Sequence, residues 1–304
     1  MAIPTTRTKV KADISIDKDK CTGCGLCVSV CKDFSLTIIE NKASASADSV
    51  FGCIGCGHCM AICPSGAIEI HGRELSPSDL FVLPAKESIA DYDSLMNLYN
   101  RRRSVREFND KPVEKELIDK IIHAAMSAPM GIPPSDVNLL VLDNKQKVLR
   151  FTEDFCKLLE GMQWLVSNWF MTIMRPFWGK ERDEFFRNFL RPLIKKYIGN
   201  MKNGVNYVTY DAPLAIYFYG SPYADPADPL IAATYAMLAG ESLGLGTCFL
   251  GAIHPMIQNS GAKNFRKAYG IRYPSKEGII VIFGYPSVKY SKGINRNFAS
   301  ITFN

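Results

Sequence analysis

Apolar residues follow two different patterns along the chain, and these patterns predict where strands and helices lie. Short apolar runs at residues 36–39 and 67–70 have the length of single strands. Residues 114–127 instead carry their apolar side chains at helical spacing. Further along, buried strands are predicted at 136–142, 213–219 and 278–285, and a mostly buried helix at 228–243. Helices and strands of this kind predict an α+β fold.

A stretch without a sustained period separates the two parts of the chain. Residues 72–91 contain two prolines, which favours a tether on the surface. Its apolar run Leu80–Leu83 is expected to pack onto one domain and to fix the linkage. The predicted organisation is therefore a first domain over residues 1–75, a linker over 76–90 and a second domain over 91–304.

A helical insertion is predicted at about residues 160–207 of the second domain. Residues 181–199 place aromatic and aliphatic side chains on one face of a helix, with a kink expected at Pro192. Several tryptophan and phenylalanine residues precede this helix. Three interpretations remain: a helix pair that embraces a second subunit, a lid that forms an aromatic pocket, or a membrane-surface helix. The first two are compatible with each other.

Composition and charge narrow the class of protein. The chain has 304 residues and a mild formal charge of +6, and no nucleic-acid partner is predicted. Its first 17 residues lack the apolar core of a signal peptide, and no apolar run is long enough for a transmembrane helix. The expected compartment is the cytoplasm, where cysteines stay reduced and serve as metal ligands more often than as disulfides.

Eight of the ten cysteines are concentrated in two blocks with the same spacing. Each block reads C-x2-C-x2-C-x3-C, and proline follows the second block. The glycines at 23, 25, 55 and 57 let the backbone curl around a cluster and direct amide groups at the sulfurs. Zinc sites and disulfides are the alternatives, but zinc sites usually show two C-x2-C pairs and a longer spacer.

The spacing predicts that the two blocks exchange their last ligand. Three cysteines on a tight loop reach three irons of one four-iron cluster, whereas the fourth lies on the next helical turn and faces the other cluster. One cluster is therefore assigned to Cys21, Cys24, Cys27 and Cys63. The second is assigned to Cys53, Cys56, Cys59 and Cys31. Residues 13–74 accordingly resemble the bacterial two-cluster (2x 4Fe-4S) ferredoxins.

Four stretches of the second domain together carry a second resemblance. They read RRRSVREF at 101–108, SAPMGIPPSD at 127–136, GESLGLGTCFLGAI at 240–253 and FGYPSVKYSKGINR at 283–296. In this order and spacing they resemble the nitroreductase family of FMN enzymes over about residues 91–304. The chain has no G-x-G-x-x-G after a strand and no Walker A loop, so a built-in Rossmann site for a nicotinamide is not expected.

The resemblance implies how FMN is held. Arg102 and Ser104 would contact the phosphate and the ribityl chain, and Arg106 would lie near the N1 and O2 edge of the flavin, where a positive charge favours reduction. Leu250 and Gly251 would offer backbone amides near N5 and O4. The full set of implied FMN contacts is Arg102, Arg103, Ser104, Arg106, Pro129, Met130, Gly131, Ser135, Leu250, Gly251, Lys292 and Arg296.

One position departs from the pattern of the resembled family. Many members have an asparagine and a glutamine–proline pair where this chain has residues 132–136. Pro133 supplies neither an amide donor nor a polar side chain. Ser135 and Asp136 are the candidates for holding the O4 and N3 edge of the flavin instead.

The predicted function combines the two resemblances. Electrons from a ferredoxin or similar low-potential donor would pass through two 4Fe-4S clusters to FMN, and a nitro, quinone or enone compound would be reduced. The chemistry is centred on the flavin, so no side chain is assigned as catalytic. A homodimer is expected. Alternatives are an electron-transfer or redox-sensing flavoprotein and a reductive dehalogenase-like enzyme, and NAD(P)H remains a second candidate donor.

Overall fold

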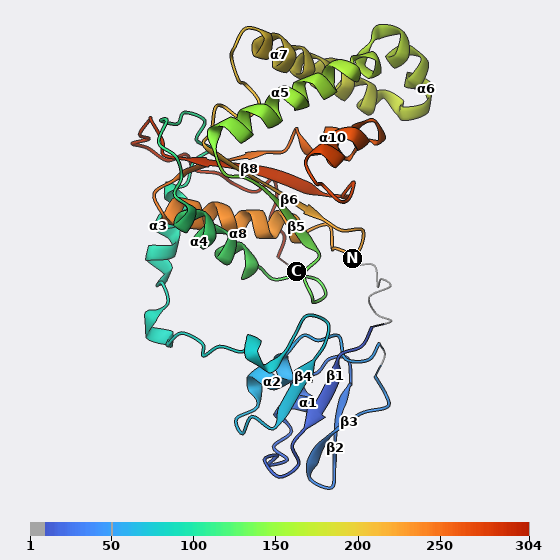
Figure 1. Ribbon diagram of the computed structural model, residues 1–304, viewed down its shortest axis with the longest axis vertical. Helices are drawn as coiled ribbons and strands as arrows, with labels where there is room; N and C mark the ends of the chain where they lie inside the picture. The colour runs from blue at the N-terminus through green and yellow to red at the C-terminus, as the bar shows by residue number, and fades with distance from the viewer. Residues whose placement is uncertain (1–9, 50, 304) are drawn as a thin grey trace. The chain divides into compact units, whose positions relative to one another are not determined.

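The computed structural model describes residues 10–49 and 51–303. The first nine residues of the predicted domain 1–75 and the last residue of 91–304 lie outside the described residues. The chain divides into two compact units. The first unit contains residues 1–89, 129–138 and 220–228, and the second contains 90–128, 139–219 and 229–304. Each unit is described in turn (Figure 1).

Short antiparallel strand pairs and two five-residue helices build most of the first unit. Strand β1 (Asp13–Ile16) pairs with β4 (Ile68–His71), and β2 (Leu36–Ile39) pairs with β3 (Lys42–Ala45). Helices α1 (Leu26–Val30) and α2 (His58–Ile62) each begin after a left-handed glycine, Gly25 and Gly57. The strands expected at 36–39 and 67–70 are thus confirmed, the second shifted by one residue.

The core of the first unit is small and rich in cysteine. Cys21, Cys27 and Cys59 are buried together with Met60 and Ile70. Since a module of this size buries little aliphatic surface, its stability depends on whatever the cysteines bind. Within the same unit, Arg73 donates hydrogen bonds to the carbonyl oxygens of Ile54 (2.8 Å) and Pro133 (2.6 Å).

A four-stranded sheet forms the centre of the second unit. Its order is β5–β6–β8–β7, and β8 is antiparallel to both of its neighbours. The strands run over β5 (Val137–Leu142), β6 (Leu214–Gly220), β7 (Gly246–Leu250) and β8 (Gly278–Gly284). All seven residues of β6 are buried, which explains why its sequence is a continuous apolar run rather than an alternating one.

Helices cover both faces of this sheet (Figure 1). On one face, Phe151 and Phe155 of α5 (Lys145–Gly161) pack in a core with Tyr217 of β6 and Ile282 of β8. Alternate strand residues point to the other face, which α4 (Lys115–Met126) and α8 (Asp228–Ser242) cover. Shorter helices complete the unit: α3 (Tyr92–Arg101), α9 (His254–Gln258) and α10 (Lys263–Ala268). The predicted α+β class is confirmed.

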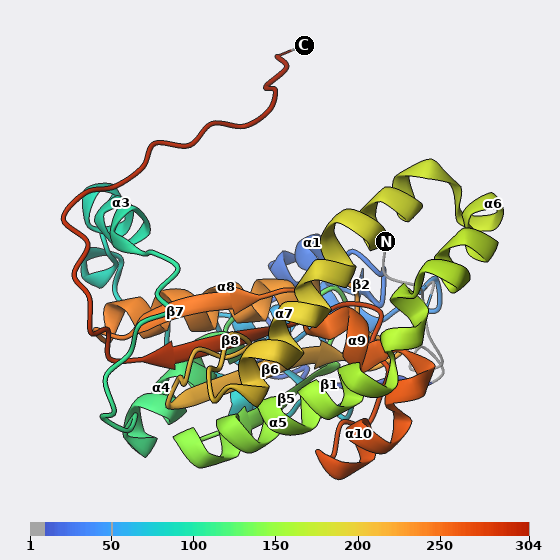
Figure 2. The ribbon, with the colours of Figure 1, turned by 90° about the horizontal axis from the view of Figure 1, so that it is seen from above.

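The insertion differs from the single kinked helix that its sequence predicts. Helix α6 (Asn168–Phe185) is interrupted at Gly179, whose φ is 77° and ψ 175°. A π-helical turn, η5 (Phe186–Leu190), then leads into α7 (Arg191–Lys202), and Pro192 lies in the first turn of α7. Proline fits a first turn without disturbing it, so the break occurs at Gly179 rather than at Pro192. Figures 1 and 2 show α7 alongside α5 and α6 beyond the end of α5.

The run Leu80–Leu83 does not pack onto either unit, so this expectation is wrong. Phe81, Val82 and Leu83 are 77%, 94% and 77% exposed. Between β4 and α3 the chain forms a turn that Gly72 and Leu75 close, and two short 3-10 turns, η2 (Pro77–Asp79) and η3 (Lys86–Ser88). An apolar sequence predicts a tendency to bury, but Pro77 and Pro84 keep this segment from the regular hydrogen bonding that would lay it against a sheet or helix.

Candidate functional site

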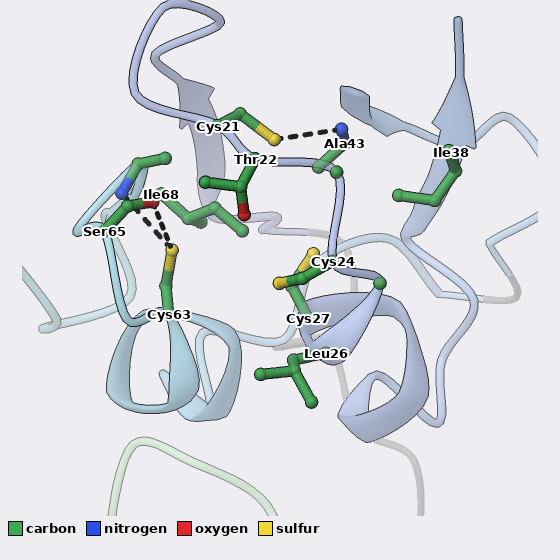
Figure 3. A pocket seen from close by; sticks show the side chains of 13 residues that line it. Cys21, Thr22, Cys24, Leu26, Cys27, Ile38, Ala43, Cys63, Ser65 and Ile68 are labelled. Atoms are coloured by element: carbon green, nitrogen blue, oxygen red, sulfur yellow. Dashed lines mark hydrogen bonds between the residues drawn. The ribbon is translucent and has the colours of Figure 1, made fainter. Parts of the chain in front are cut away.

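Side chains with functional chemistry form two cysteine groups in the first unit and one arginine group in the second. In the first unit, Cys21, Cys24, Cys27 and Cys63 line one pocket (Figure 3). Cys24 and Cys27 flank the start of α1, and Cys63 comes from the end of α2. Leu26, Ile38 and Ile68 also line the pocket. The structure thus brings the last cysteine of the second block beside the first three cysteines of the first block, as the spacing predicts.

Backbone amides point at two of these sulfurs. The Ala43 amide donates to Cys21 Sγ (Figure 3) and the Ala67 amide to Cys63 Sγ, each at 3.3 Å. The amides of Ala43 and Gly23 hold the pKa of Cys21 below its usual value. Burial acts against ionisation of Cys63, but the donors at Ala67 and Ser65 outweigh it and lower that pKa. These donors favour thiolates, the form that binds iron.

The remaining four cysteines also form a group. Cys53, Cys56 and Cys31 all lie close enough to Cys59 to act on its ionisation. Burial is the largest influence and raises the pKa of Cys59 to about 12. Such a thiol keeps its proton unless a cation compensates the charge, so metal binding at this group must release protons.

Each cysteine group offers four thiols, the number of ligands that a four-iron cluster takes. Among residues 10–49 and 51–303, no three His, Cys, Asp or Glu side chains are close enough to hold one metal ion. In a four-iron cluster each thiolate binds a different iron, so the sulfurs surround the cluster and need not meet at a point. The glycines at 23, 25, 55 and 57 all have φ between 69° and 77°, as the predicted curled loops require.

A pair of glycine variants tests the first cluster loop. A Cβ atom on Gly23 would overlap the Asn41 carbonyl oxygen, whereas one on Gly25 would meet nothing within 4 Å. Both glycines are left-handed, so alanine costs each about 1–2 kcal/mol in backbone strain. We expect Gly23→Ala to lose about half of the bound iron and Gly25→Ala to keep most of it, measured as iron per chain after anaerobic purification. Equal iron loss in both variants would contradict the role of the Asn41 contact.

In the second unit, the motif 101–108 lies along the free edge of β7. The Val105 amide donates to the Thr247 carbonyl at 2.9 Å, and Ser104 forms an isolated parallel β-bridge with Thr247. A Cβ on Gly246 would overlap the side chain of Val105. A glycine is therefore required at 246 so that Val105 can pack closely against β7. This packing keeps the arginines of the motif beside β7.

Three arginines and the carboxy-terminal segment meet at this edge. Burial raises the pKa of Glu241 on α8, and the nearby guanidinium groups of Arg101, Arg102 and Arg103 oppose that rise. A Cβ on Gly293 would lie 2.5 Å from Nη2 of Arg103, so the segment that carries Lys292 runs against this guanidinium. One carboxyl beside three arginines leaves an excess of positive charge, which suits a phosphate dianion.

The other implied FMN residues are distributed over both units. Leu250 is buried at the end of β7, and Gly251 after it is exposed. Lys292 and Arg296 are exposed on an extended segment that follows β8. Residues 129–135 belong to the first unit, where Gly131 donates its amide to Asp228 at 3.1 Å and Ser135 accepts from the Val137 amide at 3.3 Å. Their roles toward FMN remain predictions.

Several neighbours of Arg106 were not found from the sequence. The guanidinium carbon of Arg106 lies 5.6 Å from the ring centre of Tyr210. Burial raises the pKa of Tyr197 to about 12, with Tyr210 and Cys156 adding to the rise. Burial also raises the pKa of Cys248, and the positive charge of Arg106 opposes that rise. Cys156 and Cys248 are both buried thiols, as expected. The tyrosines are distant in sequence from residues 101–108 and belong to no local motif.

Comparison with known proteins identifies two regions of the chain. The sequence model of the nitroreductase family matches residues 99–285, and that of the 4Fe-4S dicluster domain matches residues 13–73. A curated relative named FMN reductase (NAD(P)H), from Bacillus subtilis strain 168, is 29% identical over 153 residues. The match covers 50% of this chain and 51% of that relative, so the chain spans about half the length of the relative.

Solved structures are similar over the second region. A nitroreductase with bound FMN from Bacteroides fragilis NCTC 9343 has a TM-score of 0.51 and 18% sequence identity. The similar region covers 69% of this chain and 97% of the Bacteroides chain. A nitroreductase with bound FMN from Desulfitobacterium hafniense DCB-2 has a TM-score of 0.47 and 21% sequence identity. The similar region covers 68% of this chain and 96% of the Desulfitobacterium chain. The first of these similarities establishes the fold. No helix among the residues described is long and apolar enough to cross a membrane.

Proposed function

Because the chain belongs to the nitroreductase family, we propose that it is an FMN-dependent oxidoreductase that reduces an electrophilic small molecule of the nitro, quinone or enone type. The observation that carries this proposal is the group of arginines held at the free edge of β7. FMN bound in the Bacteroides fragilis relative supports the choice of cofactor. When bound, FMN supplies the exchange of electrons and hydride with donor and substrate.

The chain's own residues bind and orient the cofactor in this proposal. Arg102, Arg103 and Ser104 hold the phosphate and the ribityl chain, and Lys292 and Arg296 add charge from the carboxy-terminal segment. Arg106 places its charge at the N1 and O2 edge, and the Leu250 and Gly251 amides face N5 and O4. Residues Pro129, Met130, Gly131 and Ser135 complete the proposed set.

The dicluster domain suggests where the electrons come from. We propose that a ferredoxin or similar low-potential donor delivers them one at a time to two 4Fe-4S clusters, from which they reach FMN. The presence of both matched regions in one chain supports this route. A homodimer and a cytoplasmic location are part of the same proposal.

A matched pair of arginine variants tests the flavin site. Arg101 and Arg102 are adjacent and carry the same charge, but only Arg102 is proposed to contact the phosphate. A lost charged hydrogen bond costs about 1.5–3 kcal/mol, so Arg102→Ala should weaken FMN binding about 10- to 150-fold. Arg101→Ala controls for net charge and should weaken it much less. Equal weakening would mean that the phosphate is held elsewhere.

Turnover tests the reaction. Protein purified without oxygen should hold one FMN per chain and oxidise reduced methyl viologen when nitroaromatics, quinones or enones are supplied. If FMN and iron were present but no compound in the panel were reduced, the chain would be an electron relay without a substrate of its own. Absence of FMN from the wild-type protein would contradict the proposal as a whole.

A further inference from the structure

Two neighbouring residues after the insertion adopt a backbone conformation that is unfavourable for their types. Tyr210 and Asp211 both have positive φ, 53° and 52°. Each such residue costs about 1–2 kcal/mol when it is not glycine. Strain of this kind persists only where the surroundings impose it, and it is found most often at functional sites.

Buried hydrogen bonds impose the conformation here. Thr152 of α5 and Thr209 share a hydroxyl–hydroxyl bond of 2.7 Å, and both residues are fully buried. Asn206 donates to Thr209 Oγ1 at 2.8 Å and to Asp211 Oδ1 at 3.2 Å. Its own Oδ1 accepts the Val208 and Thr209 amides at 3.1 and 2.9 Å. The turn is thus anchored to α5 through Thr209 and held in shape by Asn206.

The anchored turn presents the ring of Tyr210 to Arg106. The ring packs against the core of the second unit and lies 5.6 Å from the guanidinium carbon, within the range of a cation–π contact. Arg106 also donates to the Ser104 carbonyl, but at 3.5 Å this hydrogen bond is long and weak. The aromatic ring is therefore the firmer of these two supports for the guanidinium.

We propose that Tyr210 is a positioning residue that holds the Arg106 charge in place for the pyrimidine edge of FMN. The inference rests on the proposed function, because Arg106 is assigned to that edge there. A fixed positive charge stabilises the more negative, reduced form of FMN relative to the oxidised form. Without the aromatic ring, the guanidinium is free to move toward water, where the same charge acts more weakly.

The test compares reduction potentials of bound FMN. Tyr210→Leu removes the ring, and a cation–π contact of ordinary strength corresponds to about a two- to fivefold change in equilibrium. The preference for reduced over oxidised FMN should fall by up to that factor, which for a two-electron couple lowers the potential by up to about 20 mV. Tyr210→Phe keeps the ring and should keep the potential of the wild type.

A tyrosine with a different partner provides the control. Tyr285 makes the same kind of contact, with Lys111 Nζ 4.0 Å from its ring centre, and its hydroxyl donates to Glu114 at 2.6 Å. Tyr285→Leu should therefore leave the potential unchanged. In an Arg106→Ala background, Tyr210→Leu should cause no further fall, since the two residues act through one contact.

The outcomes separate the two hypotheses. If wild-type protein contained no FMN, the proposed function would fail first. If FMN were bound and Arg106→Ala lowered the potential while Tyr210→Leu did not, only the positioning role would be wrong. A fall in Tyr210→Leu that persisted without Arg106 would also overturn it, because the ring would then act by another route. A loss in Tyr210→Leu that Tyr210→Phe restores is the supporting result.

Discussion

Replacing Cys63 with alanine should remove the cluster bound by Cys21, Cys24 and Cys27, although Cys63 belongs to the other cysteine block in sequence. Bound iron should fall from about eight toward about four per chain, because each four-iron cluster has four thiolate ligands. The structural reason is that Cys63 Sγ lines the same pocket as the first three cysteines of the first block. The reciprocal variant Cys31→Ala should remove the other cluster.

Spectra of the remaining cluster decide between the crossed and the uncrossed assignment. Cys24→Ala and Cys56→Ala provide references, since each removes a ligand whose block is not in question. The paramagnetic resonance spectrum of reduced Cys63→Ala should match that of Cys24→Ala, and the spectrum of Cys31→Ala that of Cys56→Ala. The reverse matching would refute the crossed assignment. Cys156→Ala, in the other unit, should keep both clusters.

Combining Cys24→Ala with Cys56→Ala should abolish turnover that is driven by a ferredoxin-type donor. Both side chains are exposed, so their loss disturbs the packing of the first unit least among the ligands. Even changes one shell beyond a metal ligand cost about 10- to 100-fold in activity, so the loss of a ligand from each cluster should cost at least about 100-fold. The measurement is substrate reduction with an enzymatically reduced ferredoxin.

Chemical reduction of the flavin is the control for this double variant. With dithionite as the reductant, substrate should still be consumed at the rate of the wild type, because the proposed flavin site is the arginine group of the second unit. Unchanged turnover with the ferredoxin donor would show that the clusters are not on the electron route. Loss of both activities together with FMN would indicate a folding defect rather than a broken route.

The elements with a strong apolar pattern are well predicted from the sequence. Strands β6 and β8 and helix α8 lie within one or two residues of their expected bounds, because burial on both faces or on most sides leaves long apolar runs. The spacing within each cysteine block likewise predicts a cluster loop, and the exchange of the fourth ligand between the blocks stays a prediction. Within an apolar run or a cysteine block the information is local in sequence.

Features that depend on distant parts of the chain are the ones that sequence patterns miss. The exposed run Leu80–Leu83 has the composition of a buried segment, and only the fold determines that nothing covers it. The sequence favours a kink at Pro192, but a proline in the first turn of a helix does not break it, and the position of that first turn is not evident from the sequence. The helix is interrupted at Gly179 instead. Tyr210 meets Arg106 because a hydrogen bond between Thr209 and Thr152 of α5 anchors its turn, and no pattern near Tyr210 or Arg106 encodes that bond.

The position of Cys63 beside the first block also makes the halves of the dicluster region depend on each other. Each cysteine of the first block has a counterpart 32 positions later, at 21 and 53, 24 and 56, 27 and 59, and 31 and 63. A half taken alone would offer three sulfurs to its own cluster and hold a fourth that faces outward. A separate half would therefore complete its set of four ligands only by associating with a second half. The covalent link between the halves makes that association intramolecular, so it does not depend on protein concentration.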